Sequence, residues 1–287
     1  MMRTTLTRLC LIAVAAVVAG VSGAPADARS LKEILSSKVI RLGTVPYPPM
    51  TQRDPRTNNY SGLWVEGPTF LFEQLGLKVE LVETKWATFP SGLQSNQFDV
   101  FVGGSFATPK RSVAVDFSRP VMYMGHSVTI RKDDAGKFKT MADLDKAGVT
   151  IATVLGTSGH EYLKQNFKNA TIRALDTGDL TQDSLEVLAG RADAALQDAF
   201  KVAQVVSKHP EKLVDLFGDR PFYLLPIAYA VASGNKELLQ MINTGLEWMD
   251  STGKWQELAK PYQADLGGVY YVQPSYKPFG GTAAKGN

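Results

Sequence analysis

Hydrophobic and polar positions divide the chain after residue 28 into two series of alternating strands and helices. The first series predicts a buried strand, a helix, a half-buried strand, a short helix and a strand entering a glycine turn, over 39–45, 65–76, 77–84, 88–96 and 98–104. The second predicts strands over 148–156, 169–176 and 192–198, and helices over 158–167, 183–190 and 199–209. Strands that alternate with helices form mostly parallel sheets flanked by helices. The pattern therefore indicates an α/β fold with two lobes.

Two extended segments connect the predicted lobes, over 127–134 and over 222–233. A long helical pattern over 237–262 follows the second segment and is expected to pack back on the first lobe. Two crossing segments between two lobes form a hinge with a cleft between the lobes. The predicted parts are a signal peptide at 1–28, a first lobe at 29–127 plus 229–266, a second lobe at 128–228, and a flexible tail at 267–287.

The N-terminal segment has the pattern of a secretory signal peptide. Arg3 and Arg8 precede an apolar run over 9–21, and an A-x-A cleavage site ends at Ala28. The run is too short for a transmembrane helix. The single cysteine, Cys10, lies at the start of the apolar run and not after it, so no lipid anchor is expected and the mature chain has no disulfide. The sequence thus predicts a periplasmic protein.

Composition excludes several other classes of protein. The formal net charge is +3, with no basic run, so no nucleic-acid partner is expected. The three histidines have no spacing typical of a metal site or of a nucleophile–base pair. No P-loop or dinucleotide motif occurs. The sequence predicts no cofactor, no metal and no catalytic residue.

Three segments lie where predicted strands end, which is where open α/β sheets bind ligands. Gly103 and Gly104 allow a close backbone approach, and Arg111 after them is able to hold a carboxylate. The alternative is a turn followed by a solvated arginine. In the second segment, Ser158-Gly-His-Glu161 matches a capping box that opens a helix, and such a helix end attracts an anion. The alternative there is a plain capped helix.

The third segment ends at Asp198. An acid at this position pairs with a ligand ammonium or caps the next helix, and the residue alone favours the cap.

Four stretches in order resemble motifs of the family 3 periplasmic binding proteins, the amino-acid receptors of ABC importers. They are IRLGTVPYPPM, TPKRSVAVDFSRP, VLGTSGHEYL and GRADAALQDAF, at 40–50, 108–120, 154–163 and 190–200. The resemblance extends from Val39 to Tyr262. It implies the type II periplasmic binding protein fold, in which two lobes close on a small ligand.

The resemblance also implies the roles of individual residues. Arg111 would bind the ligand α-carboxylate, and Thr157 and Ser158, with their backbone N–H groups, would add hydrogen-bond donors to the same group. Asp198 would bind the ligand ammonium.

The resemblance gives the pocket an aromatic wall, and there the sequence departs from the family. Tyr47 would pack against the ligand, and Trp86 would add an apolar contact, with core packing as its alternative role. Many members have serine or threonine at Phe106, and an acid is usual at Trp64. The aromatic residues favour an uncharged, bulky apolar or aromatic ligand. The remaining wall residues would be Gly104, Ser105 and Phe106.

The expected function is capture of an amino-acid-like molecule for an ABC transporter permease, by a monomer without catalytic activity. Cyclohexadienyl (prephenate/arogenate) dehydratases share this fold, and the Gly103-Gly104 turn and the aromatic pocket resemble theirs, so a periplasmic dehydratase is the alternative. That enzyme needs an acid to protonate a leaving hydroxyl. A sensor-type receptor domain is a third alternative.

Overall fold

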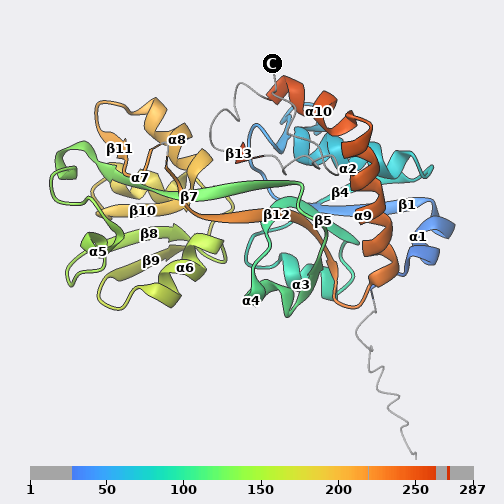
Figure 1. Ribbon diagram of the computed structural model, residues 1–287, viewed down its shortest axis with the longest axis horizontal. Helices are drawn as coiled ribbons and strands as arrows, with labels where there is room; N and C mark the ends of the chain where they lie inside the picture. The colour runs from blue at the N-terminus through green and yellow to red at the C-terminus, as the bar shows by residue number, and fades with distance from the viewer. Residues whose placement is uncertain (1–27, 219, 263–269, 272–287) are drawn as a thin grey trace, which may run out of the picture.

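The computed structural model describes residues 28–218, 220–262 and 270–271. Eleven of its strands form one mixed sheet that runs through both lobes (Figure 1). The central order of strands is β4 (Lys78–Glu83), β1 (Val39–Thr44), β5 (Val100–Phe106), β12 (Phe222–Ala232), β7 (Met122–Arg131), β10 (Ala194–Asp198), β8 (Thr150–Val154) and β9 (Thr171–Leu175). Strand β6 (Val115–Phe117) pairs with β12, whereas β11 (Leu213–Asp215) and β13 (Tyr270–Tyr271) pair with β7. Strands β2 (Gln52–Arg53) and β3 (Tyr60–Ser61) form a separate hairpin.

The helices fall into two groups in Figure 1, one in each lobe. The first lobe carries α1 (Leu31–Ser37), α2 (Leu63–Glu73), α3 (Phe89–Gln94), α4 (Pro109–Ser112), α9 (Lys236–Ser251) and α10 (Lys254–Ala259). The second carries α5 (Met141–Leu144), α6 (Ser158–Asn166), α7 (Gln182–Leu188) and α8 (Ala199–Lys208). Short 3₁₀ turns lie at η1 (Lys132–Asp134) and η2 (Lys260–Tyr262).

The two lobes have the same plan, as the sequence pattern predicts. In the first lobe β4, β1 and β5 are parallel, and β12 joins them antiparallel. In the second lobe β9, β8 and β10 are parallel, and β7 joins them antiparallel. The α/β fold class is confirmed.

Two long strands cross between the lobes and pair with each other. β12 matches the predicted segment closely, whereas β7 begins at Met122, before the predicted start at Ser127. The lobe boundaries at 127/128 and 228/229 stay a prediction, because β7 runs across the first of them and β12 across the second.

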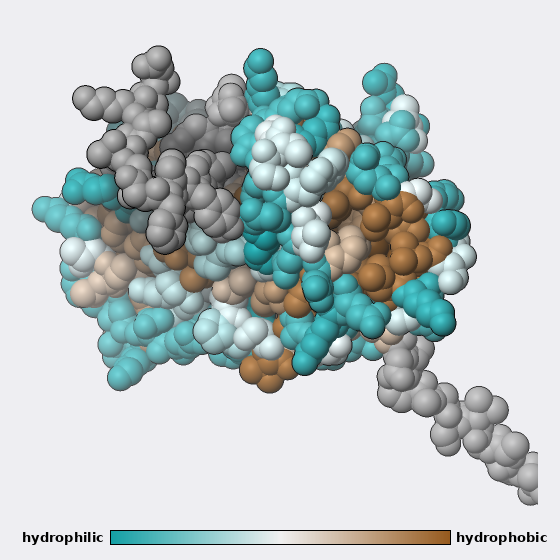
Figure 2. Space-filling model, turned by 45° about the vertical axis from the view of Figure 1, so that its right-hand side comes forward, coloured by the Kyte–Doolittle hydropathy of each residue, from teal (hydrophilic) through white to brown (hydrophobic). Residues whose placement is uncertain are grey.

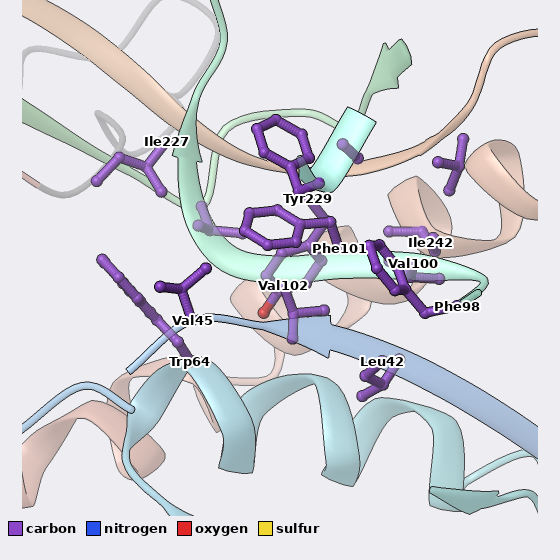
Figure 3. Close-up of a cluster of buried hydrophobic side chains, with 14 of the residues drawn as sticks. Leu42, Val45, Trp64, Phe98, Val100, Phe101, Val102, Ile227, Tyr229 and Ile242 are labelled. Atoms are coloured by element: carbon purple, nitrogen blue, oxygen red, sulfur yellow. The ribbon is translucent and has the colours of Figure 1, made fainter. Parts of the chain in front are cut away.

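Apolar side chains fill the interior of each lobe. The largest cluster lies mainly among β1, β5, α2 and α9, where Figure 3 shows Leu42, Phe101 and Ile242, and it extends to Phe200 of the second lobe. The second lobe has two smaller clusters, around Ile151 and around Val187. Burial of these side chains gives each lobe its own stabilising core.

The C-terminal helical segment packs on the first lobe, as predicted, but it is not one helix. Gly67 of α2 lies against Trp255 of α10, and Gly245 of α9 lies against Leu71 of α2. The predicted helix over 237–262 breaks at Gly253, which has φ +73°. A left-handed residue ends the regular helical bonding, so α9 and α10 are separate helices.

The predicted signal peptide and tail fall almost entirely outside the described residues. Within the described part of the chain, no helix is long and apolar enough to cross a membrane. The outer face of the first lobe has a hollow among α1, α2 and α9 that is open to solvent, and Figure 2 shows apolar residues gathered on this face. Trp248 is 42% exposed there.

Candidate functional site

A small cavity lies between the two lobes, at the carboxyl ends of β1, β5, β8 and β10. Residues from both lobes line it: Tyr47, Trp64, Trp86, Gly104, Phe106, Arg111, Met124, Thr157, Ser158, Leu180, Gln197 and Asp198. The parallel strands of both lobes end at the same gap, which brings together loops that are distant in sequence. The cavity is therefore the candidate ligand site.

Eight of the nine residues predicted for the site line this cavity, and Ser105 does not. Gly104 and Phe106 face the cavity, whereas Ser105 between them is fully buried on the other side of β5. Successive side chains of a strand point to opposite faces, which explains the difference. Ser105 acts from behind the wall instead, because its Oγ accepts a hydrogen bond of 3.1 Å from Nη1 of Arg111.

Arg111 is buried and joins the two lobes. Its Nη1 also donates to the carbonyl oxygen of Phe106 at 3.1 Å, and its Nη2 donates to the carbonyl oxygen of Gly156 at 2.8 Å. Its Nε lies 3.5 Å from Oε1 of Glu161. Burial lowers the pKa of Arg111, and the Glu161 carboxylate opposes that shift. A guanidinium has five N–H groups, so most of them already face acceptors within the protein.

The start of α6 differs from the predicted capping box. The N-cap is Thr157, whose Oγ1 accepts from the N–H of His160 at 3.2 Å. Ser158 is the first helical residue, and its Oγ lies 2.7 Å from Nε2 of His126. Glu161 reaches toward Arg111 rather than back to the cap. The capping-box prediction is wrong because both of its side chains have other partners.

Asp198 is buried and performs two tasks at the other end of the cavity. Its Oδ1 accepts from the N–H of Lys201 at 2.9 Å, which caps α8. The same oxygen accepts a 2.8 Å hydrogen bond from the Tyr47 hydroxyl of the opposite lobe. Burial raises the pKa of Asp198, although these bonds and the charge of Lys201 pull it down. The cap is confirmed, and the ammonium role stays a prediction.

Lys201 supports this end of the cavity from the second lobe. Its Nζ donates to the carbonyl oxygen of Pro48 at 2.6 Å and lies 4.1 Å from the centre of the Tyr47 ring. Burial lowers its pKa to about 8, against the charge of Asp198. The lobes are thus joined directly at this end as well.

Aromatic rings form the wall on the first-lobe side. The rings of Tyr47 and Trp64 lie 4.5 Å apart, and Figure 3 shows Trp64 beside Val45. Gly104 has φ +75°, and a Cβ there would lie 2.2 Å from the Trp64 ring. Only glycine therefore allows the indole to occupy this position.

Trp86 is the second indole of the wall and is only 6% exposed. Its Nε1 has no hydrogen-bond partner among the described residues. A buried N–H without an acceptor is unfavourable, so an acceptor on a bound ligand would satisfy it.

Several residues of the site were not predicted from the sequence. His126 and Lys201 carried no local motif, and Glu161 was assigned to a cap. His126 comes close to the site because β7 pairs with β10, which places it opposite Asp198. Local sequence patterns contain no information about this long-range pairing. The described residues contain no cluster of three or more His, Cys, Asp or Glu side chains able to hold a metal ion.

Comparison with known proteins gives matches over most of the chain. The family model described as bacterial extracellular solute-binding proteins, family 3, matches residues 40–265. The L-cystine-binding protein TcyJ of Escherichia coli (strain K12) is 30% identical over 237 residues, which cover 80% of this chain and 86% of that protein. The cyclohexadienyl dehydratase of Pseudomonas aeruginosa is 28% identical over 203 residues, covering 68% of this chain and 74% of that enzyme.

A solved structure matches the whole two-lobed arrangement. It is the crystal structure of an ancestral amino acid-binding protein, a precursor of cyclohexadienyl dehydratase. The TM-score is 0.71 at 31% sequence identity, and the match covers 80% of this chain and 97% of that one. The likeness confirms the predicted type II fold.

Proposed function

Because this chain belongs to the bacterial extracellular solute-binding proteins of family 3, we propose that it captures an amino acid in the cavity between its lobes. The observation that carries the proposal is the placement of opposite charges on one small cavity, with Arg111 and Asp198 both in its wall. Both charges are buried, so each interacts strongly with an opposite charge on a ligand placed beside it. An amino acid supplies a carboxylate and an ammonium together.

Aromatic and apolar side chains between these charges support a ligand with an apolar or aromatic side chain. Trp64, Phe106, Met124 and Leu180 contribute this wall. The cystine-binding relative extends the choice to a sulfur-containing amino acid. The Trp86 indole favours a ligand that also presents an acceptor to it.

The proposed setting is the periplasm, where the liganded monomer delivers its ligand to an ABC permease. The family's extracellular description and the signal-peptide pattern at residues 1–28 support this setting. Arg29, the first residue after the proposed cleavage, is already part of the first lobe, since its Nε donates to Asp99 at 3.0 Å. The intact mass of periplasmic material decides the cleavage, and a mass that includes Met1 would contradict it.

A thermal-shift panel tests the ligand class. The panel contains L-cystine, L-arginine, L-lysine, L-phenylalanine and L-methionine, each beside the acid that lacks its α-amines. We expect one amino acid to stabilise the protein clearly more than its deaminated acid. Asp198→Asn keeps the shape of the site and removes its charge, so it should weaken binding of the amino acid by about tenfold or more and spare the deaminated acid. Equal binding of both compounds by the wild type would remove the role of Asp198.

Dehydration of a cyclohexadienyl acid is the second candidate function, supported by the relative from Pseudomonas aeruginosa. Asp198 lines the cavity, and Glu161 and Asp183 each contact a residue of its wall; burial raises the pKa of Asp198. Release of phenylpyruvate from prephenate, followed by absorbance, would establish this activity. We propose binding without catalysis, so no release above the rate in buffer is expected.

A further inference from the structure

His126 belongs to the crossing strand β7 and lies behind the cavity wall, where its imidazole contacts Phe106, Ser158 and the other crossing strand, β12. It is fully buried on β7, with its ring centre 4.8 Å from that of Phe106 and 5.3 Å from that of Tyr223. Its Nδ1 lies 3.2 Å from the backbone oxygen of Tyr223, and its Nε2 lies 2.7 Å from the Ser158 hydroxyl. Both ring nitrogens therefore have hydrogen-bond partners.

The partner of Nδ1 determines which way these hydrogen bonds run. The Tyr223 carbonyl oxygen only accepts, so Nδ1 of His126 must carry the proton. In the neutral imidazole the other nitrogen, Nε2, is then an acceptor. The Ser158 hydroxyl must donate to it, and this donation uses the single hydrogen of the hydroxyl.

The alternative is an imidazolium, in which Nε2 would donate to Ser158. Burial and the nearby charge of Arg111 lower the pKa of His126 to about 4, although the Tyr223 carbonyl raises it. The neutral form therefore prevails near neutral pH. In this form the Ser158 hydroxyl has only lone pairs left to offer to a ligand.

We propose that His126 is a positioning residue that makes the Ser158 hydroxyl an acceptor for the ligand ammonium, rather than a donor to its carboxylate. This inference rests on the proposed amino-acid function and reverses the donor role first expected for Ser158. Ser158 and Asp198, which both line the cavity from the second lobe, are then both acceptors, and the pairing of β10 with β7 places Asp198 opposite His126. The ligand carboxylate is left to Arg111 and to backbone N–H groups at the start of α6. His126 thereby favours ligands with an α-amine over acids of the same shape.

The first test measures the tautomer of His126 in the ligand-free protein. The chain has three histidines, so selective ¹⁵N labelling gives three imidazole signal sets, and His126→Phe assigns the relevant one. We expect a protonated Nδ1 and an unprotonated Nε2 at neutral pH. A proton on Nε2, in the other tautomer or in the imidazolium, would overturn the inference.

The second test measures selectivity by calorimetry. The probe is the panel amino acid that stabilises the wild type most, beside its deaminated acid. His126→Phe keeps a ring against Phe106 but removes the acceptor, and Ser158→Ala removes the hydroxyl. Each variant should lower the preference for the amino acid by about tenfold, and the double variant should lower it no further.

If the role of His126 is purely structural, His126→Phe should weaken the binding of both compounds equally, and that result would overturn the inference. His209→Phe is the matched control, since His209 ends α8 away from the cavity, and it should leave the preference unchanged. If the His126 variant fails to fold, Ser158→Ala and the tautomer still decide the question. If no panel amino acid binds the wild type, the proposed function is wrong, and the ligand role of Ser158 is wrong with it. The tautomer of His126 still shows the direction of the hydrogen bond between His126 and Ser158.

Discussion

The two ends of the cavity carry opposite charges, Arg111 at one end and Asp198 at the other. The protein groups that contact these two charges have opposite effects on ligand binding. At the Arg111 end, the carboxylate of Glu161 approaches the same guanidinium that the ligand carboxylate would use. At the Asp198 end, the hydroxyl of Tyr47 donates to the carboxylate that the ligand ammonium would use. Glu161 therefore competes with the ligand, whereas Tyr47 assists it.

This difference has an electrostatic basis. A hydroxyl that donates to Asp198 stabilises its ionised form, which is the form that attracts an ammonium. A second carboxylate beside Arg111 neutralises a charge that the ligand carboxylate needs. The charge of Lys201 also acts on Asp198, but its ammonium donates to the Pro48 carbonyl and to Gln204. The Asp198 carboxylate therefore stays available to a ligand ammonium, whereas the Arg111 guanidinium is partly occupied by Glu161.

The largest expected effect comes from blocking contact between the lobes at the Arg111 end. Gly156 has φ +79°, and a Cβ there would lie 2.6 Å from Cα of Ala87 in the opposite lobe. Gly156→Ala should hold the lobes apart and weaken ligand binding by about a hundredfold or more, because the binding-competent form is depleted. Calorimetry with the panel amino acid measures the loss.

The control for this variant separates the effect of backbone strain from the effect of the collision with Ala87. Gly148 has φ +84° in the same lobe, and a Cβ there would meet none of the described atoms within 4 Å. Gly148→Ala carries the same left-handed strain of about 1 kcal/mol and should keep wild-type affinity. Similar losses of affinity in both variants would show that strain, and not contact between lobes, limits binding.

Acid should lower the stability of the folded protein because His126, which packs against the cavity wall, is buried in its neutral form. Its pKa is lowered to about 4 in the folded protein, from 6.5, so the unfolded chain takes up the proton first. The protonation of His126 therefore has no effect on the free energy of unfolding above pH 6.5. As the pH falls toward 4, the free energy of unfolding decreases by about 3 kcal/mol. Urea unfolding at both pH values should show this loss in the wild type, and His126→Phe should lack that part of it. An equal loss in both proteins would mean that other groups cause the acid sensitivity.

Local sequence patterns predicted the two lobes and drew attention to Arg111, Ser158 and Asp198, because strand ends and glycine turns are short-range features, and all three residues line the cavity. The aromatic residues of the wall were expected from the resemblance to the family and not from local patterns. The patterns did not predict His126, because its role depends on a hydrogen bond to Ser158, which is distant in sequence. They misassigned Glu161 for the same reason, since its partner Arg111 belongs to the other lobe.

A smaller loss is expected at the Asp198 end when its assisting hydroxyl is removed. Tyr47→Phe keeps the ring against Trp64 but leaves Asp198 without that donor, so the pKa of Asp198 rises further and the ligand binds about tenfold more weakly. Calorimetry measures the change. Tyr60→Phe is the control, because it removes a 3.1 Å hydroxyl–carboxylate bond to Glu83 on the exposed surface of the same lobe. Unchanged affinity in Tyr47→Phe would show that the hydroxyl does not assist the ligand.

The smallest effect should have the opposite sign, at the Arg111 end. Glu161→Gln removes the competing charge beside Arg111, so the ligand should bind about threefold to tenfold more tightly. The same substitution also removes an ion pair between the lobes, which should weaken ligand binding. Asp176→Asn removes another ion pair between the lobes and so estimates the size of this opposing effect. Asp176 forms an exposed ion pair with Lys85 across the same gap, at 3.3 Å, and such pairs contribute little. Titration of both variants with the panel amino acid gives the comparison. Weaker binding in Glu161→Gln, with Asp176→Asn unchanged, would mean that Glu161 orients Arg111 for the ligand, and both ends of the cavity would then assist it alike.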